Sequence, residues 1–344
     1  MHQLFTVSRE LLRLRGREQE ELHARAAAAA VSRFGRNVFV RAVVEVSNFC
    51  RENCVYCGMR RDNKTLSRQR AEASRLAELI IEHRPATVTD LNIQTGEDPV
   101  AVREVVLPLI RTLRRETNLG ISVCLGTLNP DLYAELKEAG ATTYIIKFEI
   151  GDRRQYAALQ APGHYDERLD HIRHLAAMGW NVSSGFIAGV PDQTEEEMLE
   201  NFAVAATLPL HGCSVSPFIP GEATPVAGTA TGDIDLTLNA MAALRLMRPD
   251  WVIPAVSALN ISEPGGGYRR GLRTGANLAT INLTPADLRE DYLLYKRDRF
   301  IMNEERILSA LAAEGLAPSL RSLADFYHAR NHPETEARAV LNAA

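Results

Sequence analysis

The sequence predicts an α/β protein, a full (β/α)8 TIM-type barrel with N-terminal and C-terminal helical extensions. Eight apolar segments with strand-forming residues alternate with helical stretches, and this alternation is typical of a parallel barrel. The chain has 344 residues, of which 46% are hydrophobic, so it can bury one large barrel core or two ordinary cores. No linker rich in Pro, Gly or Ser interrupts the alternation.

The expected elements follow one another in chain order. The strands cover residues 39–47, 87–94, 120–125, 143–149, 180–188, 213–219, 251–256 and 277–283. The helices between them cover residues 68–83, 98–116, 130–139, 166–178, 194–206, 236–247 and 264–274. The chain then divides into an N-terminal helical extension (1–36), a barrel (37–285), and a C-terminal lid and helical tail (286–344). The first is polar and helical in pattern from about residue 8; the last contains an expected helix, 303–315, and ends with His328 and His332.

Composition excludes several classes of protein. The formal net charge is −4, which favours neither nucleic acid nor an anionic membrane surface as a partner. No apolar run reaches the roughly 18–20 residues that span a bilayer. The first residues are followed by arginines and glutamates, unlike a signal peptide. We therefore expect a cytoplasmic protein that binds neither nucleic acid nor membrane.

Three of the five cysteines lie within eight residues, directly after the first expected strand, where barrels carry their chemistry. Cys50, Cys54 and Cys57 form the pattern C-x3-C-x2-C, which in a cytosolic chain indicates metal binding or catalysis rather than disulfides. Three thiolates on one loop can ligate three irons of a 4Fe–4S cluster and leave one iron open to a substrate or cofactor. The alternative, structural zinc, usually needs four protein ligands, and no further His or Cys follows at finger spacing.

Polar residues also follow the second and fourth expected strands. In Thr95-Gly96-Glu97 the carboxylate can accept a bond from an ammonium group, and the glycine lets backbone approach a ligand. A plain turn before a helix that begins at Asp98-Pro99 explains these residues equally well. Lys147 and Glu149 alternate with apolar neighbours, so a period of two directs both into the barrel. Buried charges are costly unless partnered, so we expect a ligand site in preference to a structural salt bridge.

The C-x3-C-x2-C pattern on the first barrel loop, with the aromatic Tyr56 before its last cysteine, resembles the radical S-adenosylmethionine (SAM) superfamily. The resemblance implies that the open iron binds the amino and carboxylate groups of SAM, and that an electron from the cluster breaks SAM into methionine and a 5′-deoxyadenosyl radical. It also implies a small-molecule substrate and an electron donor such as flavodoxin or ferredoxin. The residues that it assigns to the cofactor are Tyr56, Gln94, Thr95, Gly96, Glu97, Glu149, Arg168, Ile187, Gly189 and Val190.

Longer stretches, together covering about residues 35–285, look like the biotin-synthase-like group. They are most similar to the radical SAM maturase of iron–iron hydrogenase and to 3-methylornithine synthase. The chain also departs from the maturase, which has Arg-His-Glu where this sequence has Lys147-Phe148-Glu149. An arginine near the SAM carboxylate aligns with Ala157 here, with Arg153 and Arg154 close by. Substrate specificity therefore does not follow from the resemblance.

Late segments offer residues for a substrate. Ser257, Asn260 and Asn282 would place neutral hydrogen-bonding groups at the barrel mouth, and Lys147 completes the expected substrate set. Glycines 265–267 suit either an anion-binding nest or a plain hinge. The run from 289 to 299 could form a lid over the mouth, but we expect a charged, solvated surface.

Cys124 and Cys213 fall inside strand patterns, and free cysteine is commonly a small buried residue. We expect both to pack in the barrel, and they are too few to hold a second four-cysteine cluster. An auxiliary cluster with Cys and Arg ligands, as the biotin-synthase-like resemblance would allow, is less firmly excluded.

Three functions are compatible with these residues. The leading hypothesis is a radical SAM enzyme that abstracts hydrogen from a small, amino-acid-like substrate and rearranges its carbon skeleton. The second is a maturase that helps to assemble a metallocofactor. The third is a non-catalytic iron–sulfur protein for electron transfer or scaffolding, but an electron carrier needs no SAM pocket.

Overall fold

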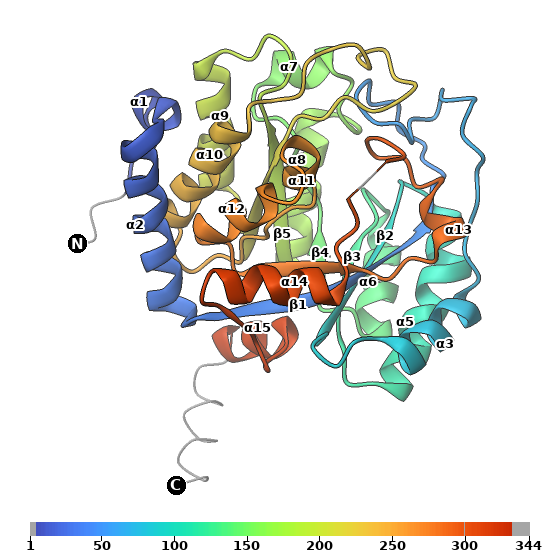
Figure 1. Cartoon of the computed structure of the whole chain (residues 1–344). Coiled ribbons are helices and arrows are strands. Elements are labelled where there is room, and N and C mark those ends of the chain that lie inside the picture. The colour runs from blue at the N-terminus through green and yellow to red at the C-terminus, as the bar shows by residue number, and fades with distance from the viewer. Residues whose placement is uncertain (1–4, 299, 332–344) are drawn as a thin grey trace, which may run out of the picture.

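Parallel strands form the centre of the fold, and most neighbours in the sheet are also neighbours in the chain. The computed structural model describes residues 5–298 and 300–331. Its sheet runs in the order β6-β5-β4-β3-β2-β1-β7, with parallel pairing throughout. The strands are β1 (Asn37–Ser47), β2 (Asp90–Thr95), β3 (Gly120–Cys124), β4 (Thr143–Ile145), β5 (Asn181–Ala188), β6 (Gly212–Pro217) and β7 (Leu278–Asn282). Together they make a seven-stranded parallel half-barrel (Figure 1).

The expected strand at 251–256 is replaced by two isolated bridges. Val252 pairs with Gly212 of β6, and Pro254 pairs with Leu278 of β7. Proline has no N–H to give to a ladder, so regular pairing cannot pass through this position. The expectation of eight regular barrel strands is therefore not met. An eighth, two-residue strand, β8 (Ala317–Pro318), joins the start of β1 instead.

Helices cover the outside of the sheet. They are α3 (Ala73–His83), α4 (Pro99–Ala101), the π-helical turn Val102–Val106, α5 (Leu107–Glu116), α6 (Pro130–Ala139), α7 (Arg153–Ala158), α8 (Tyr165–Ala177), α9 (Glu195–Thr207), α10 (Ile234–Met247), α11 (Ala258–Ser262), α12 (Gly267–Arg273) and α13 (Ala286–Arg289). Capping side chains define where several of these helices begin. Asn129 accepts a hydrogen bond from Leu132 N at the N-terminus of α6, and Thr194 and Glu197 form a capping box at the N-terminus of α9.

Successive side chains of β1 point alternately into the hydrophobic core and into the central cavity. Val40, Ala42 and Val44 are completely buried in the main hydrophobic core. Arg41 and Glu45, which point to the opposite face, line the central cavity. The period of two in a strand thus places polar residues inside the half-barrel and apolar residues under the helices.

Helices from both ends of the chain pack on this framework. The N-terminal helices α1 (Arg9–Arg13) and α2 (Gly16–Phe34) contact α10, and α14 (Glu304–Ala313) contacts β7 and β8 (Figure 1). The last described helix, α15 (Leu323–Asn331), contacts β3. His332 lies outside the described residues. Over the described part of the chain, no helix combines the length and the apolar character needed to cross a bilayer.

Candidate functional site

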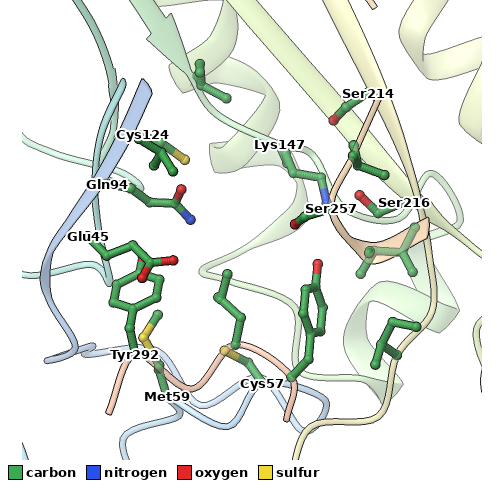
Figure 2. A pocket seen from close by; sticks show the side chains of 18 of the residues that line it. Glu45, Cys57, Met59, Gln94, Cys124, Lys147, Ser214, Ser216, Ser257 and Tyr292 are labelled. Atoms are coloured by element: carbon green, nitrogen blue, oxygen red, sulfur yellow. The ribbon is translucent and has the colours of Figure 1, made fainter. Parts of the chain in front are cut away.

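A cavity of about 360 Å³ opens inside the half-barrel, at the carboxyl ends of the strands. Figure 2 shows Glu45, Gln94 and Cys124 on one side of it and Ser214, Ser216 and Ser257 on the other. A volume of this size is within the range of ligand pockets. The strand ends therefore converge on one enclosed site, as in barrel enzymes.

The three cysteines of the loop after β1 line this cavity. Cys50, Cys54 and Cys57 carry free thiols, and Cys54 is only 8% exposed. Burial raises the pKa of all three thiols, that of Cys57 to about 12. Three thiols on one loop, one buried and two half-buried, suit an iron–sulfur cluster with a cationic core, which would hold them as thiolates. In the described residues no three His, Cys, Asp or Glu side chains are placed to hold a single metal ion.

The loop approaches β2 closely because residue 96 is a glycine. A Cβ atom at Gly96 would lie 2.2 Å from the carbonyl oxygen of Phe49 and 2.8 Å from Cys50 Cβ. The N–H of Glu97 also donates to Cys50 Sγ at 3.4 Å. The Thr-Gly-Glu turn therefore packs against the first cysteine, and it also leads directly into α4, which begins at Pro99 after Asp98, so both interpretations of the turn agree with the structure.

Glu97 is held by three donors. Its carboxylate accepts bonds from Arg168 Nη1 at 2.7 Å, Thr127 Oγ1 at 2.9 Å and Arg51 Nε at 3.3 Å. Glu97 and Arg168 are each 5% exposed. Burial alone would raise the pKa of Glu97, but the charge of Arg168 and the hydrogen bonds from Arg168 and Thr127 together outweigh burial and lower the pKa. The site thus contains a buried, ionised pair beside the cluster loop.

Lys147 and Glu149 form a second ion pair in the cavity, with Nζ and Oε2 2.8 Å apart. Burial would lower the pKa of Lys147, but Glu149 reverses the effect and raises it, so the lysine stays charged. Glu149 has a φ of 64°, a left-handed conformation that is costly outside glycine. The structure thus shows the salt bridge between these residues and places both in the cavity lining, while their expected role toward a ligand stays a prediction.

The other expected cofactor residues divide into two groups. Those that line the cavity with Glu97 and Glu149 are Tyr56, Gln94, Thr95, Gly96, Arg168 and Ile187. Gly189 and Val190 are absent from the lining, and Gly189 N instead donates to Gln193 Oε1. The two arginines near the SAM-carboxylate position of the resemblance form ion pairs elsewhere: Arg153 binds Asp166, and Arg154 binds Glu197. Arg168 lines the cavity instead, from the start of α8.

The expected substrate residues also divide. Ser257 and Asn282 line the cavity, where Asn282 Nδ2 donates to Glu45 Oε1 at 3.3 Å. Asn260 does not: its Oδ1 accepts from Tyr268 N at 2.9 Å, and it is 2% exposed. The prediction that Asn260 faces the substrate is therefore wrong, because α11 turns this side chain toward the start of α12.

Sequence reasoning missed Arg41, which lines the cavity from β1. Its Nε donates to Thr280 Oγ1 at 3.1 Å, and no carboxylate in the described residues forms a salt bridge with it. Burial lowers the pKa of Arg41 from its ordinary value. The sequence pattern could have identified it, because residues 41, 43 and 45 share one face of an otherwise apolar strand, and two of these three residues are charged.

The spare cysteines do not share one environment. Cys213 is fully buried in the core, as expected. Cys124 ends β3 and lines the cavity, where its side chain faces the open centre near Gln94 (Figure 2). The expectation that Cys124 is only a packing residue is therefore wrong. Burial raises its pKa to about 11, so it remains a thiol near neutral pH.

A segment that we expected to be a solvated surface closes one side of the cavity. Tyr292, Leu294 and Tyr295 line the cavity, and Leu294 O accepts a bond from Gly58 N of the cluster loop. These contacts favour the lid interpretation for residues 292–295, which stays a prediction. Arg299, at the end of the expected run, lies outside the described residues. Glycines 265–267 are not among the lining residues, and Gly267 begins α12.

Comparison with known proteins gives concordant results. A family model described as the radical SAM superfamily matches residues 44–204. The FeFe hydrogenase maturase subunit HydE of Thermotoga maritima is 33% identical over 264 residues, 76% of this chain and 74% of that protein. The 3-methylornithine synthase of Methanosarcina barkeri is 27% identical over 293 residues, 84% of this chain and 82% of that protein. The crystal structure of methylornithine synthase (PylB) superposes with a TM-score of 0.81 at 25% identity, covering 90% of this chain and 92% of that chain.

Proposed function

The chain belongs to the radical SAM superfamily of enzymes, and from this premise we propose that it holds one 4Fe–4S cluster at Cys50, Cys54 and Cys57 and cleaves SAM reductively. When bound, the cluster would supply the electron that releases a 5′-deoxyadenosyl radical from SAM. The observation that carries the proposal is three free thiols on one loop that all line one cavity. This arrangement gives a radical direct access to an enclosed substrate.

The walls around the cysteines support a SAM site. We propose that Tyr56, Gln94, Thr95, Gly96, Glu149, Arg168 and Ile187 contact SAM and that Glu97 holds Arg168 in the same wall, because these expected residues all line the cavity. The charges alternate around the wall, with Arg168 and Lys147 each beside a carboxylate. Such a wall can orient the ammonium and carboxylate groups of a zwitterion by charge-assisted hydrogen bonds. Contacts from Gly189 and Val190 stay a prediction.

We also propose that the substrate is small and carries an anionic group. Arg41 supports this, because a half-buried guanidinium that lines the cavity without a salt-bridge partner in the described residues is stabilised when an anion binds it. Ser214, Ser216 and Ser257 add neutral hydrogen-bonding groups on the other side of the cavity. An amino acid or a similar small carboxylate fits this set, with Lys147, Ser257 and Asn282 as proposed contacts.

Two reactions remain candidates for the chemical step. The similarity in length and fold to methylornithine synthase favours rearrangement of an amino-acid carbon skeleton. The 33% identity to HydE favours a step in metallocofactor maturation. The small, charged cavity suits the first, so rearrangement is our leading proposal.

Three further proposals complete this description. The bridges at Val252 and Pro254 support closure of the half-barrel as a (β/α)8 barrel. The helices packed on it support the division into residues 1–36, 37–285 and 286–344. An electron donor such as flavodoxin or ferredoxin would reduce the cluster.

Anaerobic reconstitution tests the central proposal. The wild-type chain should bind about four irons and form 5′-deoxyadenosine from SAM when reduced. Alanine at any of Cys50, Cys54 and Cys57 should abolish both properties. A triple variant that still cleaved SAM reductively would contradict the proposal.

A panel of amino acids then distinguishes the two reactions. Under the leading proposal, one of them increases 5′-deoxyadenosine formation above the basal rate and is converted to an isomer. Arg41→Met should remove this stimulation and leave the basal rate intact, because Arg41 is not a ligand of the cluster. If no amino acid is converted, the maturase proposal gains support.

A further inference from the structure

Arg68 lies outside the cysteine motif, yet it joins both sides of the cluster loop. Its Nη1 donates to Asn48 O at 2.5 Å and to Met59 O at 2.9 Å. Its Nη2 donates to Arg60 O at 2.6 Å and to Asn63 O at 3.4 Å. Asn48 precedes the first cysteine, and the other three follow the last one. One guanidinium thus clamps the two ends of the segment that carries all three thiols.

The clamp is reciprocal. The side chain of Asn48, 1% exposed, donates from Nδ2 to Ser67 O at 2.7 Å and accepts at Oδ1 from Gln69 N at 2.7 Å. Arg68 lies between these two residues and binds the backbone of Asn48 in return. Two side chains therefore fix the strand end and the segment 67–69 against each other, which limits the positions open to the loop between them.

The guanidinium of Arg68 binds the loop that carries the cysteines, and it has no acidic partner within the described residues. All four of its hydrogen-bond acceptors are neutral carbonyls, and within the described residues it forms no salt bridge. Burial lowers its pKa, and the groups whose negative charge opposes this are Cys50 and Cys57. Nearby arginines differ, because Arg70 binds Asp98 and Arg61 binds Asp62.

We propose that Arg68 is a positioning residue for the cluster that also raises its reduction potential. The inference rests on the proposed function, since it requires a 4Fe–4S cluster at the three cysteines. Reduction adds one negative charge to a group that three thiolates already make anionic. A fixed cation at the same loop stabilises the more negative state, and charge and hydrogen bonding near the sulfurs are among the factors that set such potentials.

The test is a redox titration of the reconstituted full-length protein, followed by electron paramagnetic resonance in the absence of SAM. Arg68→Met removes the charge and all four bonds. We expect the ratio of reduced to oxidised cluster at a fixed potential to fall on the order of tenfold, which is about 59 mV for one electron. Arg68→Lys keeps the charge but cannot span four carbonyls. It should shift the potential by less than half as much, while a chelator removes its iron faster than from wild type.

Arg61→Met is the matched control, because Arg61 is close in sequence but 60% exposed and paired with Asp62. Its effect should be small, since solvent screens an exposed charge. A wild-type potential in Arg68→Met would overturn the proposal, and so would an equal shift in Arg68→Lys, which would assign the effect to loop geometry alone.

Variants that lose the cluster also decide the question. Loss of iron from Arg68→Met and Arg68→Gln with retention in Arg68→Lys supports a need for the charge. Loss from all three variants overturns the electrostatic role. Failure of the wild-type chain to take up a cluster is a different result, since it refutes the proposed function itself.

Discussion

Glu97→Gln is the most informative single change at the site, because it removes a charge and keeps the shape. The Glu97 carboxylate accepts bonds from Arg168, Thr127 and Arg51. A carboxylate offers about four lone-pair sites, so three donors leave it little capacity for an ammonium group of SAM. We therefore expect Glu97 to act mainly by holding Arg168 in the cavity wall.

The size of the effect follows from burial. Both members of the Glu97–Arg168 pair are 5% exposed, so solvent screens the interaction little. Removal of one partner of a buried pair lowers the free energy of unfolding by about 3–5 kcal/mol. We expect a loss of about 3 kcal/mol, the lower end of this range, because the amide oxygen of glutamine still accepts one bond. With a urea m-value of roughly 3 kcal/mol/M, the unfolding midpoint should fall by about 1 M.

Anaerobic urea unfolding of the cluster-free protein measures this loss. Arg168→Met provides the second side of a double-mutant cycle, and the double variant should be more stable than the sum of the two losses by at least about 1 kcal/mol. Both single variants should also weaken SAM binding to the reconstituted protein by roughly ten- to a hundredfold, because they disturb the same wall. Additive stability losses would refute the pairing. Wild-type SAM affinity in Arg168→Met, with weak binding in Glu97→Gln, would restore a direct contact between Glu97 and the SAM ammonium.

Three further predictions concern residues around the site. Cys213→Ala should destabilise the protein by about 1 kcal/mol through a small core cavity, whereas Cys124→Ala should change stability little, and iron content should be normal in both; loss of iron in either variant would contradict this assignment. Burial lowers the pKa of His23 and His211, so the unfolded chain binds protons more readily than the folded one. The free energy of unfolding, measured with urea, should therefore reach its full value above about pH 6.5 and decrease as the pH falls below that value. Substitution of both histidines by glutamine should make this decrease smaller. An unchanged pH profile in that variant would count against the mechanism. Asn260→Ala should lower the free energy of unfolding by about 1–3 kcal/mol with SAM affinity unchanged, because its amide binds backbone at the start of α12; weaker SAM binding at wild-type stability would return Asn260 to the site.

Local sequence patterns were sufficient to predict most of the strands and helices and the loop that carries the three cysteines. Strand and helix periodicities are properties of short segments, so the half-barrel rhythm could be predicted from the chain alone. The three thiols lie within eight residues, and their shared loop needed no knowledge of distant contacts. The alternation that directs Lys147 and Glu149 to one side is equally local, and both line the cavity.

Local periodicity also failed where one residue interrupts it. Residues 251–256 read as a strand, but Pro254 lacks the N–H that a ladder requires, and only two bridges form. Asn260 was expected at the mouth because it follows an apolar segment. The short helix α11 turns its side chain away instead, toward Tyr268 N.

The partners inside the cavity were decided only by the tertiary structure. Arg168 and Glu97 are 71 positions apart, and Arg41 and Thr280 are 239 apart. The sequence by itself determined that a loop with three cysteines follows the first strand and that charged residues end several others. Which charges meet depends on strand register and on how α8 and the segment 292–295 pack over the sheet, and these long-range contacts leave no periodic signal in the chain.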